Sequence, residues 1–392
     1  MSGDLRRRRF ALFAFFFIPG VALASWVTRT PAIRDGIDAS LAAMGLVLLG
    51  LSAGSMCGIL LSGVLVGRWG TRPVSIMGLW LLLAGVAVMA AGTGLGLAVV
   101  VALGLCLFGL GMGASEIAIN IDGAGVERLS GRPLMHALHG CFSLGTAFGA
   151  LAGFGLARID LPVAWHLGLI AAVAVPPVLW FARWIPPGTG VTIRRVPGRA
   201  EAPAPYRDPY WRDPRLYLIG LAVLAVALAE GAANDWLPIL MVDEHGFSPA
   251  SGSLAYLGFS VAMTLGRFAG GTFLRRHGPV AVMRVTTALC AAGLALVILT
   301  PVPALAAGSV LLWGLGASLG FPIAISAAGA SGPDATGRVR TVTICGYIAF
   351  LVGPPLLGLI GEIWGLRSAM LVVLALILAA AAVAGALRPR AG

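Results

Sequence analysis

Lysine is absent from this sequence, and all 27 of its basic residues are arginine. Charge of either sign is scarce as well, because only 11% of the 392 residues are charged, whereas a soluble domain carries roughly 25%. Hydrophobic residues make up 58% of the chain, and its mean hydropathy is +0.94. These values exclude an ordinary soluble domain and indicate a membrane protein.

The sequence also lacks the patterns by which many enzymes and metalloproteins are recognised. It contains no HExxH, no nucleotide-binding loop and no cluster of metal ligands, and its five cysteines show no CxxC spacing. We therefore expect no enzymatic activity, no cofactor and no metal. A net charge of +11 would suggest a nucleic-acid partner for a soluble protein. We expect no such partner here, since the arginines cluster at alternate ends of apolar segments.

Long apolar stretches recur along the whole chain, with only short polar breaks between most of them. A helix needs about 20 such residues to cross a bilayer, so the pattern predicts an all-α membrane protein with twelve transmembrane helices. The predicted spans are 10–30, 41–66, 74–92, 97–122, 135–157, 163–183, 215–240, 249–273, 280–300, 304–327, 341–361 and 367–387. The first span begins like a cleavable signal peptide, but it stays apolar to about Thr28, which favours a transmembrane helix.

The arginines also predict how these helices are oriented. With residue 1 in the cytoplasm, 22 arginines fall at cytoplasmic ends and loops, and only Arg29, Arg34, Arg158 and Arg367 fall on the opposite side. This asymmetry is the one that the positive-inside rule describes. We therefore expect a multi-pass protein of a bacterial cytoplasmic (inner) membrane with both termini in the cytoplasm.

One long polar segment, residues 185–213, lies midway along the chain and is rich in proline, glycine and arginine. It is predicted to be a cytoplasmic linker. It would join an N-terminal half of six helices, 1–184, to a C-terminal half of six helices, 214–392. At its end, Asp213 followed by Pro214 is typical of a helix N-cap and first helical position.

The two halves repeat each other, which is typical of transporters. A shift of 208 residues aligns the second span with the eighth and superposes two ladders of small residues that recur at every fourth position, where they let helices approach closely. The ladders are Gly50, Gly54, Gly58 and Ser62 in the first half and Gly258, Ala262, Gly266 and Gly270 in the second. A second match pairs residues 107–111 with 312–316, and Ile-Ala-Ile follows in both, after one extra residue in the second half.

The loops after the second and eighth spans resemble a known signature. Residues 63–72 read Gly-Val-Leu-Val-Gly-Arg-Trp-Gly-Thr-Arg, which resembles the loop motif of the major facilitator superfamily, and 271–278 resembles a degenerate copy. The resemblance implies a role in gating for Gly63, Arg68, Gly70, Arg72, Gly271, Arg276 and Gly278. Gly67 departs from the pattern, because the family usually has Asp there. An ion pair from that position is therefore not carried over.

Within that superfamily, the chain resembles the fucose-permease-like branch of sugar:proton symporters. The likeness rests on Glu116-Ile-Ala-Ile-Asn120 in the fourth span, Glu230-Gly-Ala-Ala-Asn-Asp235-Trp236 in the seventh, Gly266-Arg267-Phe268 in the eighth, and Gly346-Tyr347 to Pro354-Pro355 in the eleventh. The first span departs, since no acidic residue lies between Asp4 and Asp35. The resemblance implies transport of a sugar with protons, but not specificity for fucose.

Glu116 is the first candidate for proton coupling. An ionised carboxylate at the centre of a membrane helix costs at least about 2.5 kcal/mol, so a group exposed to each aqueous side in turn can bind and release a proton. Asn120 lies one turn away on the same helix face and can bind either the carboxylate or a hydroxyl of the cargo. The alternative is that Glu116 is a permanently paired or protonated packing residue.

The seventh and eighth spans hold three more charged candidates. Glu230 is predicted to be the deeper acid of the seventh span and a candidate for proton coupling or cargo binding, with structural pairing as the alternative. Asp235 is a candidate cargo ligand, unless it lies at the water interface beside Trp236. Arg267 is predicted to be a structural anchor near the inner surface.

Aromatic and histidine side chains complete the candidate set. Trp26, Phe142, Tyr256 and Tyr347 can stack on the apolar face of a sugar ring, although a single aromatic side chain in a span more often serves packing or lipid contact. His136 and His139, at the start of the fifth span, can titrate near neutrality. We rank them below Glu116 because residues near a cytoplasmic helix start are commonly solvated.

These patterns together predict a secondary transporter that moves a sugar or similar small polar solute with protons by alternating access. Its expected partners are that small molecule, protons and the lipid bilayer, and we expect it to act as a monomer. The alternative is a proton-driven efflux antiporter for an amphipathic compound. Antiporters of the superfamily usually have a Gly-Pro turn in the fifth span, and residues 145–153 contain no proline, so symport is favoured.

Overall fold

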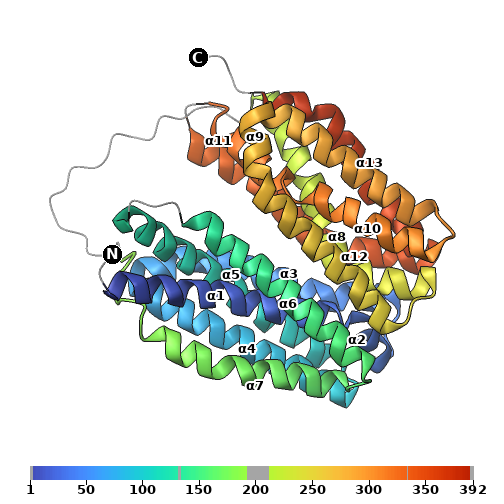
Figure 1. Ribbon diagram of the computed structural model, residues 1–392, viewed down its shortest axis with the longest axis horizontal. Helices are drawn as coiled ribbons and strands as arrows, with labels where there is room; N and C mark the ends of the chain where they lie inside the picture. Colours follow the sequence, from blue (N-terminus) through green and yellow to red (C-terminus); the bar gives the residue numbers. More distant parts are fainter. Residues whose placement is uncertain (1–2, 131–133, 192–211, 333, 389–392) are drawn as a thin grey trace. The chain divides into compact units, whose positions relative to one another are not determined.

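The computed structural model describes residues 3–130, 134–191, 212–332 and 334–388, and every regular element in those ranges is a helix (Figure 1). The first half contains α1 (Gly3–Val27), α2 (Thr30–Gly36), α3 (Leu41–Trp69), α4 (Thr71–Leu95), α5 (Ala98–Ser130), α6 (Met135–Arg158) and α7 (Val163–Ala182). The second half contains α8 (Pro214–His245), α9 (Pro249–Leu299), α10 (Pro303–Ala317), α11 (Gly320–Gly329), α12 (Ala335–Trp364), α13 (Leu366–Val383) and the short 3₁₀ helix η2 (Ala384–Leu387). Most of the predicted linker, 185–213, lies outside the described residues.

The predicted set of apolar spans is confirmed within the described residues. Eleven helical stretches are long and apolar enough to cross a membrane, and α9, with its 51 residues, contains both the eighth and the ninth predicted spans. The two parts of α9 meet at Gly278, where φ is 76° and ψ is 168°. Because this conformation is open to glycine and strained for other residues, Gly278 marks the loop between two membrane helices.

The tenth predicted span is interrupted, because a short break separates α10 from α11. Its counterpart in the first half, α5, is continuous over 33 residues. The second half has one extra residue here, and Pro322 in the first turn of α11 has no N–H to donate to the preceding turn. Aligning the Ile-Ala-Ile segments places Pro322 opposite Glu116 and Ser326 opposite Asn120. The acidic candidate of the first half is therefore not duplicated.

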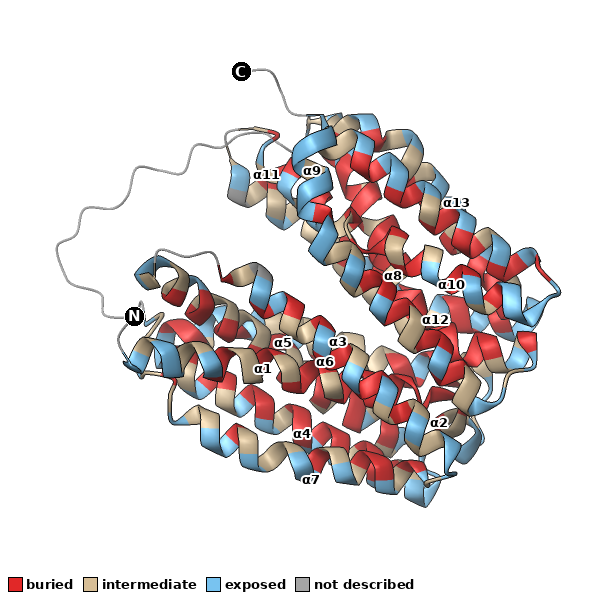
Figure 2. Ribbon diagram, viewed as in Figure 1, coloured by how far each residue is buried: buried red, intermediate tan, exposed pale blue. Residues whose placement is uncertain are grey.

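The chain divides into two compact units. Unit 1 comprises Met1–Arg195 with Ser248–Leu257, and unit 2 comprises Val196–Phe247 with Gly258–Gly392. Inside unit 1, α1 packs on α6 while α3 and α4 pack on α5; inside unit 2, α8 packs on α12 and α13. The first helix of each half is the most buried, since 72% of the most apolar stretch of both α1 and α8 is buried (Figure 2). The internal repeat thus extends from sequence to packing.

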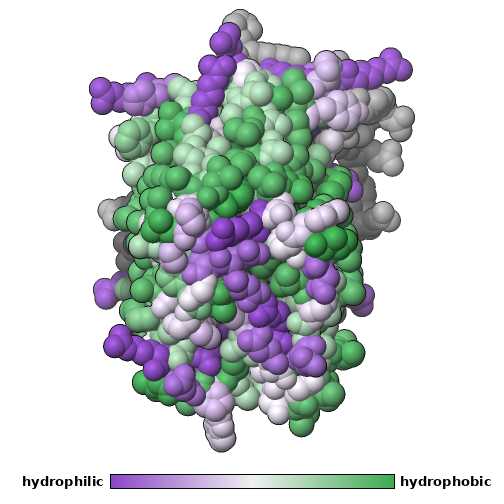
Figure 3. Space-filling model, turned by 90° about the vertical axis from the view of Figure 1, so that its right-hand side faces the viewer, coloured by the Kyte–Doolittle hydropathy of each residue, from purple (hydrophilic) through white to green (hydrophobic). Residues whose placement is uncertain are grey.

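Large apolar side chains are exposed on the surface of the molecule. Leu60, Val99, Trp165 and Leu299 are between 67% and 73% exposed, and hydrophobic residues cover much of the face drawn in Figure 3. A water-soluble protein rarely exposes so much contiguous apolar surface, whereas lipid tails solvate it readily. The chain is a multi-pass membrane protein.

The loops after the second and the eighth predicted spans each contain a glycine with the same backbone conformation. Gly70, between α3 and α4, has φ 87° and ψ 172°, close to the values at Gly278. The predicted N-cap is also confirmed, because Asp213 caps α8 by accepting a hydrogen bond from the Arg215 backbone N–H at 3.1 Å, and Pro214 begins the helix. Local sequence signals therefore set both the loop shape and the entry into α8.

The small-residue ladders differ between the halves in how tightly they pack. A Cβ added to Gly50 on α3 would lie 2.5 Å from the backbone oxygen of Ala102 on α5. The same atom added to the repeat-related Gly258 would meet only the end of the Leu311 side chain, at 3.2 Å. The first ladder thus brings two backbones together, whereas the second contacts a side chain that can move.

This difference predicts opposite outcomes for one substitution at the two related sites. Gly50→Ala should lower the free energy of unfolding by about 1–3 kcal/mol, since α5 must shift to admit the methyl group. Gly258→Ala should be neutral or slightly stabilising, because alanine is the better helix former by about 1 kcal/mol. Unfolding by sodium dodecyl sulfate in mixed micelles measures both values, and equal loss in both variants would contradict the packing argument.

Candidate functional site

Unit 1 gathers three polar candidates and a phenyl ring from three helices. Glu116 and Asn120 lie one turn apart on α5, and both are partly exposed. His139 on α6 is exposed, and its Nε2 lies 3.1 Å from Asn120 Oδ1, so that Nε2–H donates and the amide oxygen accepts. The edge of the imidazole also meets the ring of Phe16 on α1, with centroids 5.1 Å apart. The structure joins Asn120 to His139, whose companion His136 has a side chain outside the described part.

Unit 2 contains an ion pair between two of the predicted site residues. Arg267 Nη2 on α9 donates to Glu230 Oε1 on α8 at 2.9 Å. The two side chains are 32% and 21% exposed, so each charge is offset by the other but is also open to solvent or to a bound molecule. The predicted anchor, Arg267, therefore has a carboxylate partner, and Glu230 has the pairing foreseen as its alternative role.

Asp235 occupies a different environment from the one predicted. Its side chain is only 7% exposed, and the neighbouring Trp236 is fully buried. The alternative that Asp235 lies at a water interface is therefore wrong. The two residues are five positions apart, which is about 140° around a helix, so they face different surroundings.

The four aromatic candidates separate into two groups. Trp26 and Tyr256 are each 1% exposed and belong to the largest fully buried side chains of the protein. Phe142 on α6 and Tyr347 on α12 are partly exposed. In this conformation only the second pair has surface available for stacking on a cargo.

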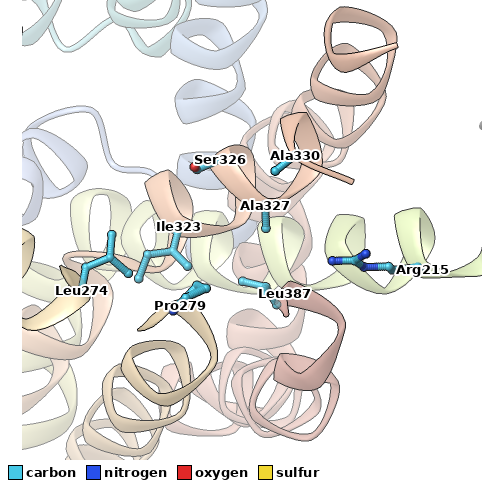
Figure 4. A pocket seen from close by; sticks show the side chains of 8 residues that line it. All are labelled: Arg215, Leu274, Pro279, Ile323, Ser326, Ala327, Ala330 and Leu387. Carbon is cyan, nitrogen blue, oxygen red and sulfur yellow. The ribbon is translucent and has the colours of Figure 1, made fainter. Parts of the chain in front are cut away.

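A cavity of about 170 Å³ lies in unit 2 and is mostly apolar (Figure 4). It is lined by Arg215, Leu274, Pro279, Ile323, Ser326, Ala327, Ala330 and Leu387. None of these is a predicted site residue, and the polar groups just described lie elsewhere. We therefore base the candidate site on the clustered polar side chains and not on this cavity.

Comparison with known proteins agrees with this arrangement. The model of the Major Facilitator Superfamily matches residues 134–343, which is more than half of the chain. An uncharacterised transporter of the same type from Yersinia pestis is 31% identical, covering 95% of this chain and 93% of that protein. The chain belongs to the major facilitator superfamily. Members of this superfamily bind small-molecule substrates in a membrane, and the chain is a transporter of that kind.

Solved structures of the superfamily share the fold over almost the whole chain. A crystal structure of the nucleoside transporter NupG superposes with a TM-score of 0.79 at 14% identity and covers 97% of this chain and 99% of that one. The transporter FucP in its outward conformation superposes with a TM-score of 0.65 at 16% identity, covering 97% and 98%. At these identities the likeness shows the fold alone. FucP is a fucose:proton symporter, so the predicted resemblance to the fucose permease is confirmed at the level of the fold.

Within the described residues, the arginines of the loop signature form no ion pair. Arg68 and Arg276 are exposed and Arg72 is partly exposed, and none of the three forms an ion pair with a described residue. This agrees with the presence of Gly67 at the position where an acid is usual. Gly63 and Gly271 are exposed as well. The glycines Gly70 and Gly278 retain the shape of the loops, as described above.

A different ion pair, which the sequence did not reveal, is buried at the same end of unit 1. Arg8 Nη2 and Nε donate to the two oxygens of Asp122 at 2.6 and 2.9 Å. Asp122 is 1% exposed and also accepts from the hydroxyl of Thr71 at 3.1 Å, while Arg8 donates to the hydroxyl of Thr189. This cluster joins the start of α1, the last part of α5, the start of α4 and the chain after α7. The only sequence signal was an acid, Asp122, at the edge of the fourth predicted span.

Unit 2 has a comparable buried pair that was also missed. Arg338 on α12 is 3% exposed and donates from Nη1 to Asp213 Oδ2 at 2.8 Å and to the hydroxyl of Ser331 at 3.1 Å. Asp213 therefore caps α8 with one oxygen and binds α12 with the other. In the sequence alone, Arg8 and Arg338 indicate only the orientation of the helices.

Proposed function

We propose that this transporter is a proton-coupled symporter for a sugar or a similar small polyhydroxylated solute, working by alternating access. The observation that carries the proposal is the placement of ionisable and amide side chains inside membrane helices. Glu116, Asn120 and His139 form a group on α5 and α6, and Glu230 pairs with Arg267 on α8 and α9. Such groups are costly in lipid and are usually retained for transport.

The proposed roles follow from the hydrogen-bonding capacity of each group. Asn120 and His139 offer donors and acceptors to hydroxyl groups, while the partly exposed pair of Glu230 and Arg267 offers two charges to the same kind of ligand. Glu116 has no charged copy in the second half and is the proposed proton carrier of unit 1.

Two names among the similar structures support the choice of solute. NupG is named a nucleoside transporter and FucP a fucose:proton symporter, and both a nucleoside and fucose contain a hydroxylated sugar ring. The arginine distribution supports placement in a bacterial inner membrane with both termini in the cytoplasm. We further propose that the functional form is a monomer.

The proposal is tested with the purified full-length protein in liposomes. Radiolabelled sugars, polyols and nucleosides are offered with an inward proton gradient, without a gradient, and with a protonophore. Accumulation that requires the gradient is the expected result for at least one hydroxylated solute. Gradient-driven movement in the opposite direction, found only for amphipathic compounds, would replace the symporter with the efflux antiporter.

Glu116→Gln should separate transport from coupling. Glutamine keeps the size and hydrogen bonding of the side chain but cannot ionise, so accumulation driven by a proton gradient should fall at least about tenfold, in line with the cost of charge in a membrane helix. Exchange of labelled for unlabelled cargo across the membrane should remain, because it needs no proton release.

The matched control is Glu127→Gln on the same helix. Glu127 accepts the backbone N–H groups of Leu134 and Met135, a role that a glutamine oxygen can take over. This variant should accumulate cargo normally. Full accumulation by Glu116→Gln would assign that residue to packing.

A further inference from the structure

Asp235 is the most isolated acid of α8. Its side chain is 7% exposed, and it forms no hydrogen bond or ion pair with any described residue. The indole Nε1 of the adjacent Trp236 is buried without a hydrogen-bond partner as well, so that group does not donate to the carboxylate. Asp235 lies ten residues before the end of α8, about 15 Å along the helix axis, well inside the span.

The helices packed against α8 in unit 2 supply no charge to offset an ionised Asp235. These neighbours are α10, α11, α12, α13 and η2, of which α10, α11 and η2 contain no ionisable residue. The ionisable residues of the other two are Arg338, Arg340, Cys345, Tyr347 and Glu362 on α12 and Arg367 on α13. None of them interacts with Asp235, and both Arg338 and Arg367 are bound elsewhere.

Other ionisable groups of α8 and α9 are also engaged away from Asp235. Arg267 is paired with Glu230, and Glu244 lies 3.6 Å from Arg367. A buried carboxylate with neither a cation nor a hydrogen-bond donor is unstable in its charged form, whereas Glu230 has a cation partner in Arg267. Glu230 and Asp235 therefore lie in opposite electrostatic environments on the same helix.

We propose that Asp235 is a proton-binding site of this transporter, occupied by a proton in the conformation described here and released when the residue is exposed to water. The proposal rests on the proposed function for its role, since it adds a proton site to the coupling of a proton-driven transporter. It goes beyond the coupling assigned above, because it adds a proton carrier in unit 2, Asp235, to the carrier proposed in unit 1, Glu116.

The test is infrared spectroscopy of the purified full-length protein at neutral pH, in detergent micelles without ester carbonyl groups, which needs no cargo. A protonated carboxyl group gives a carbonyl band that an ionised carboxylate does not. In a Glu116→Gln background, which removes any band of the carrier proposed in unit 1, the protein should show the band, Asp235→Asn should lose it, and Asp235→Glu should shift its frequency, which retains the assignment even if the asparagine variant folds poorly. Glu230→Gln should keep the band unchanged.

Asp243→Asn is the matched control, since Asp243 is an exposed acid two turns further along α8. Its spectrum should equal that of the wild type. A band that persists unshifted in both Asp235 variants, or that disappears in Asp243→Asn, would overturn the proposal. If the band behaves as expected but no solute accumulates with a proton gradient, the symport function fails while the proton site stands. If accumulation occurs and the band is unaffected, only the proton site fails.

Discussion

Asp122→Asn should lower the free energy of unfolding by about 3–5 kcal/mol, the usual cost of removing one partner of a buried ion pair. Asp122 is 1% exposed and Arg8 is 12% exposed, so the guanidinium would keep its charge without a carboxylate. The hydroxyl of Thr71 would lose a charged acceptor as well. Unfolding in mixed micelles with increasing sodium dodecyl sulfate measures the change.

Two further variants separate the ion pair from general damage to unit 1. Asp35→Asn removes an acid that also lies 2.9 Å from an arginine, but Asp35 is 63% exposed, so the expected loss is about 0–1 kcal/mol. Arg8→Met combined with Asp122→Leu should cost less than Asp122→Asn alone, because no unpaired charge remains. An Asp122→Asn protein as stable as the wild type would show that the pair contributes nothing.

Glu230→Gln should reduce the rate of cargo transport about 30-fold, which corresponds to about 2 kcal/mol. This is the lower end of the range for breaking a hydrogen-bonded charge pair, chosen because both side chains are partly exposed. Arg267 would be left as an uncompensated charge inside a span, and a ligand would lose one of the two charges of the site. Initial rates in liposomes, with a cargo found by the solute screen, give the number.

Glu244→Gln provides a comparison on the same helix. Glu244 lies 3.6 Å from Arg367 and accepts the backbone N–H of Leu366 at 2.8 Å, near the end of α8 and ten or more residues from the proposed site. Its replacement should leave the transport rate within about twofold, because the pair lies at the far end of α8 from Glu230 and shares no partner with it. A folded Glu230→Gln protein that transports at the wild-type rate would assign the pair of Glu230 and Arg267 to structure alone.

The fold was predictable because its determinants are local. Each span is a run of apolar residues, and Asp213 and Pro214 indicate the start of α8. The bend at Gly278 was also predictable, because residues 271–278 resemble a copy of the loop that contains Gly70. The extra residue in the second repeat indicates an irregularity near the break between α10 and α11. The repeat alone does not predict that the helix breaks there, because this also depends on the position of Pro322.

The candidate site was predictable only in part, because ion pairs depend on distant segments. Arg8 and Asp122 are 114 positions apart, and nothing in the sequence near either residue names the other. Arg267 and Glu230 were both selected, yet their pairing was not, since it depends on how α8 and α9 pack. The burial of Asp235 was missed for a related reason: helical periodicity gives the angle between two residues but not what lies opposite each face.

The cluster around Asp122 joins segments of unit 1 that are synthesised at different times. Arg8 and Thr71 are made first, Asp122 follows, and Thr189 arrives only after α7 is complete. A nascent chain therefore carries the ion pair of Arg8 and Asp122 without its last hydrogen-bond partner until residue 189 has left the ribosome. Among the described residues, every hydrogen-bond and ion-pair partner of Arg8 and Asp122 precedes the second half, so this buried pair can be completed before the second half is translated.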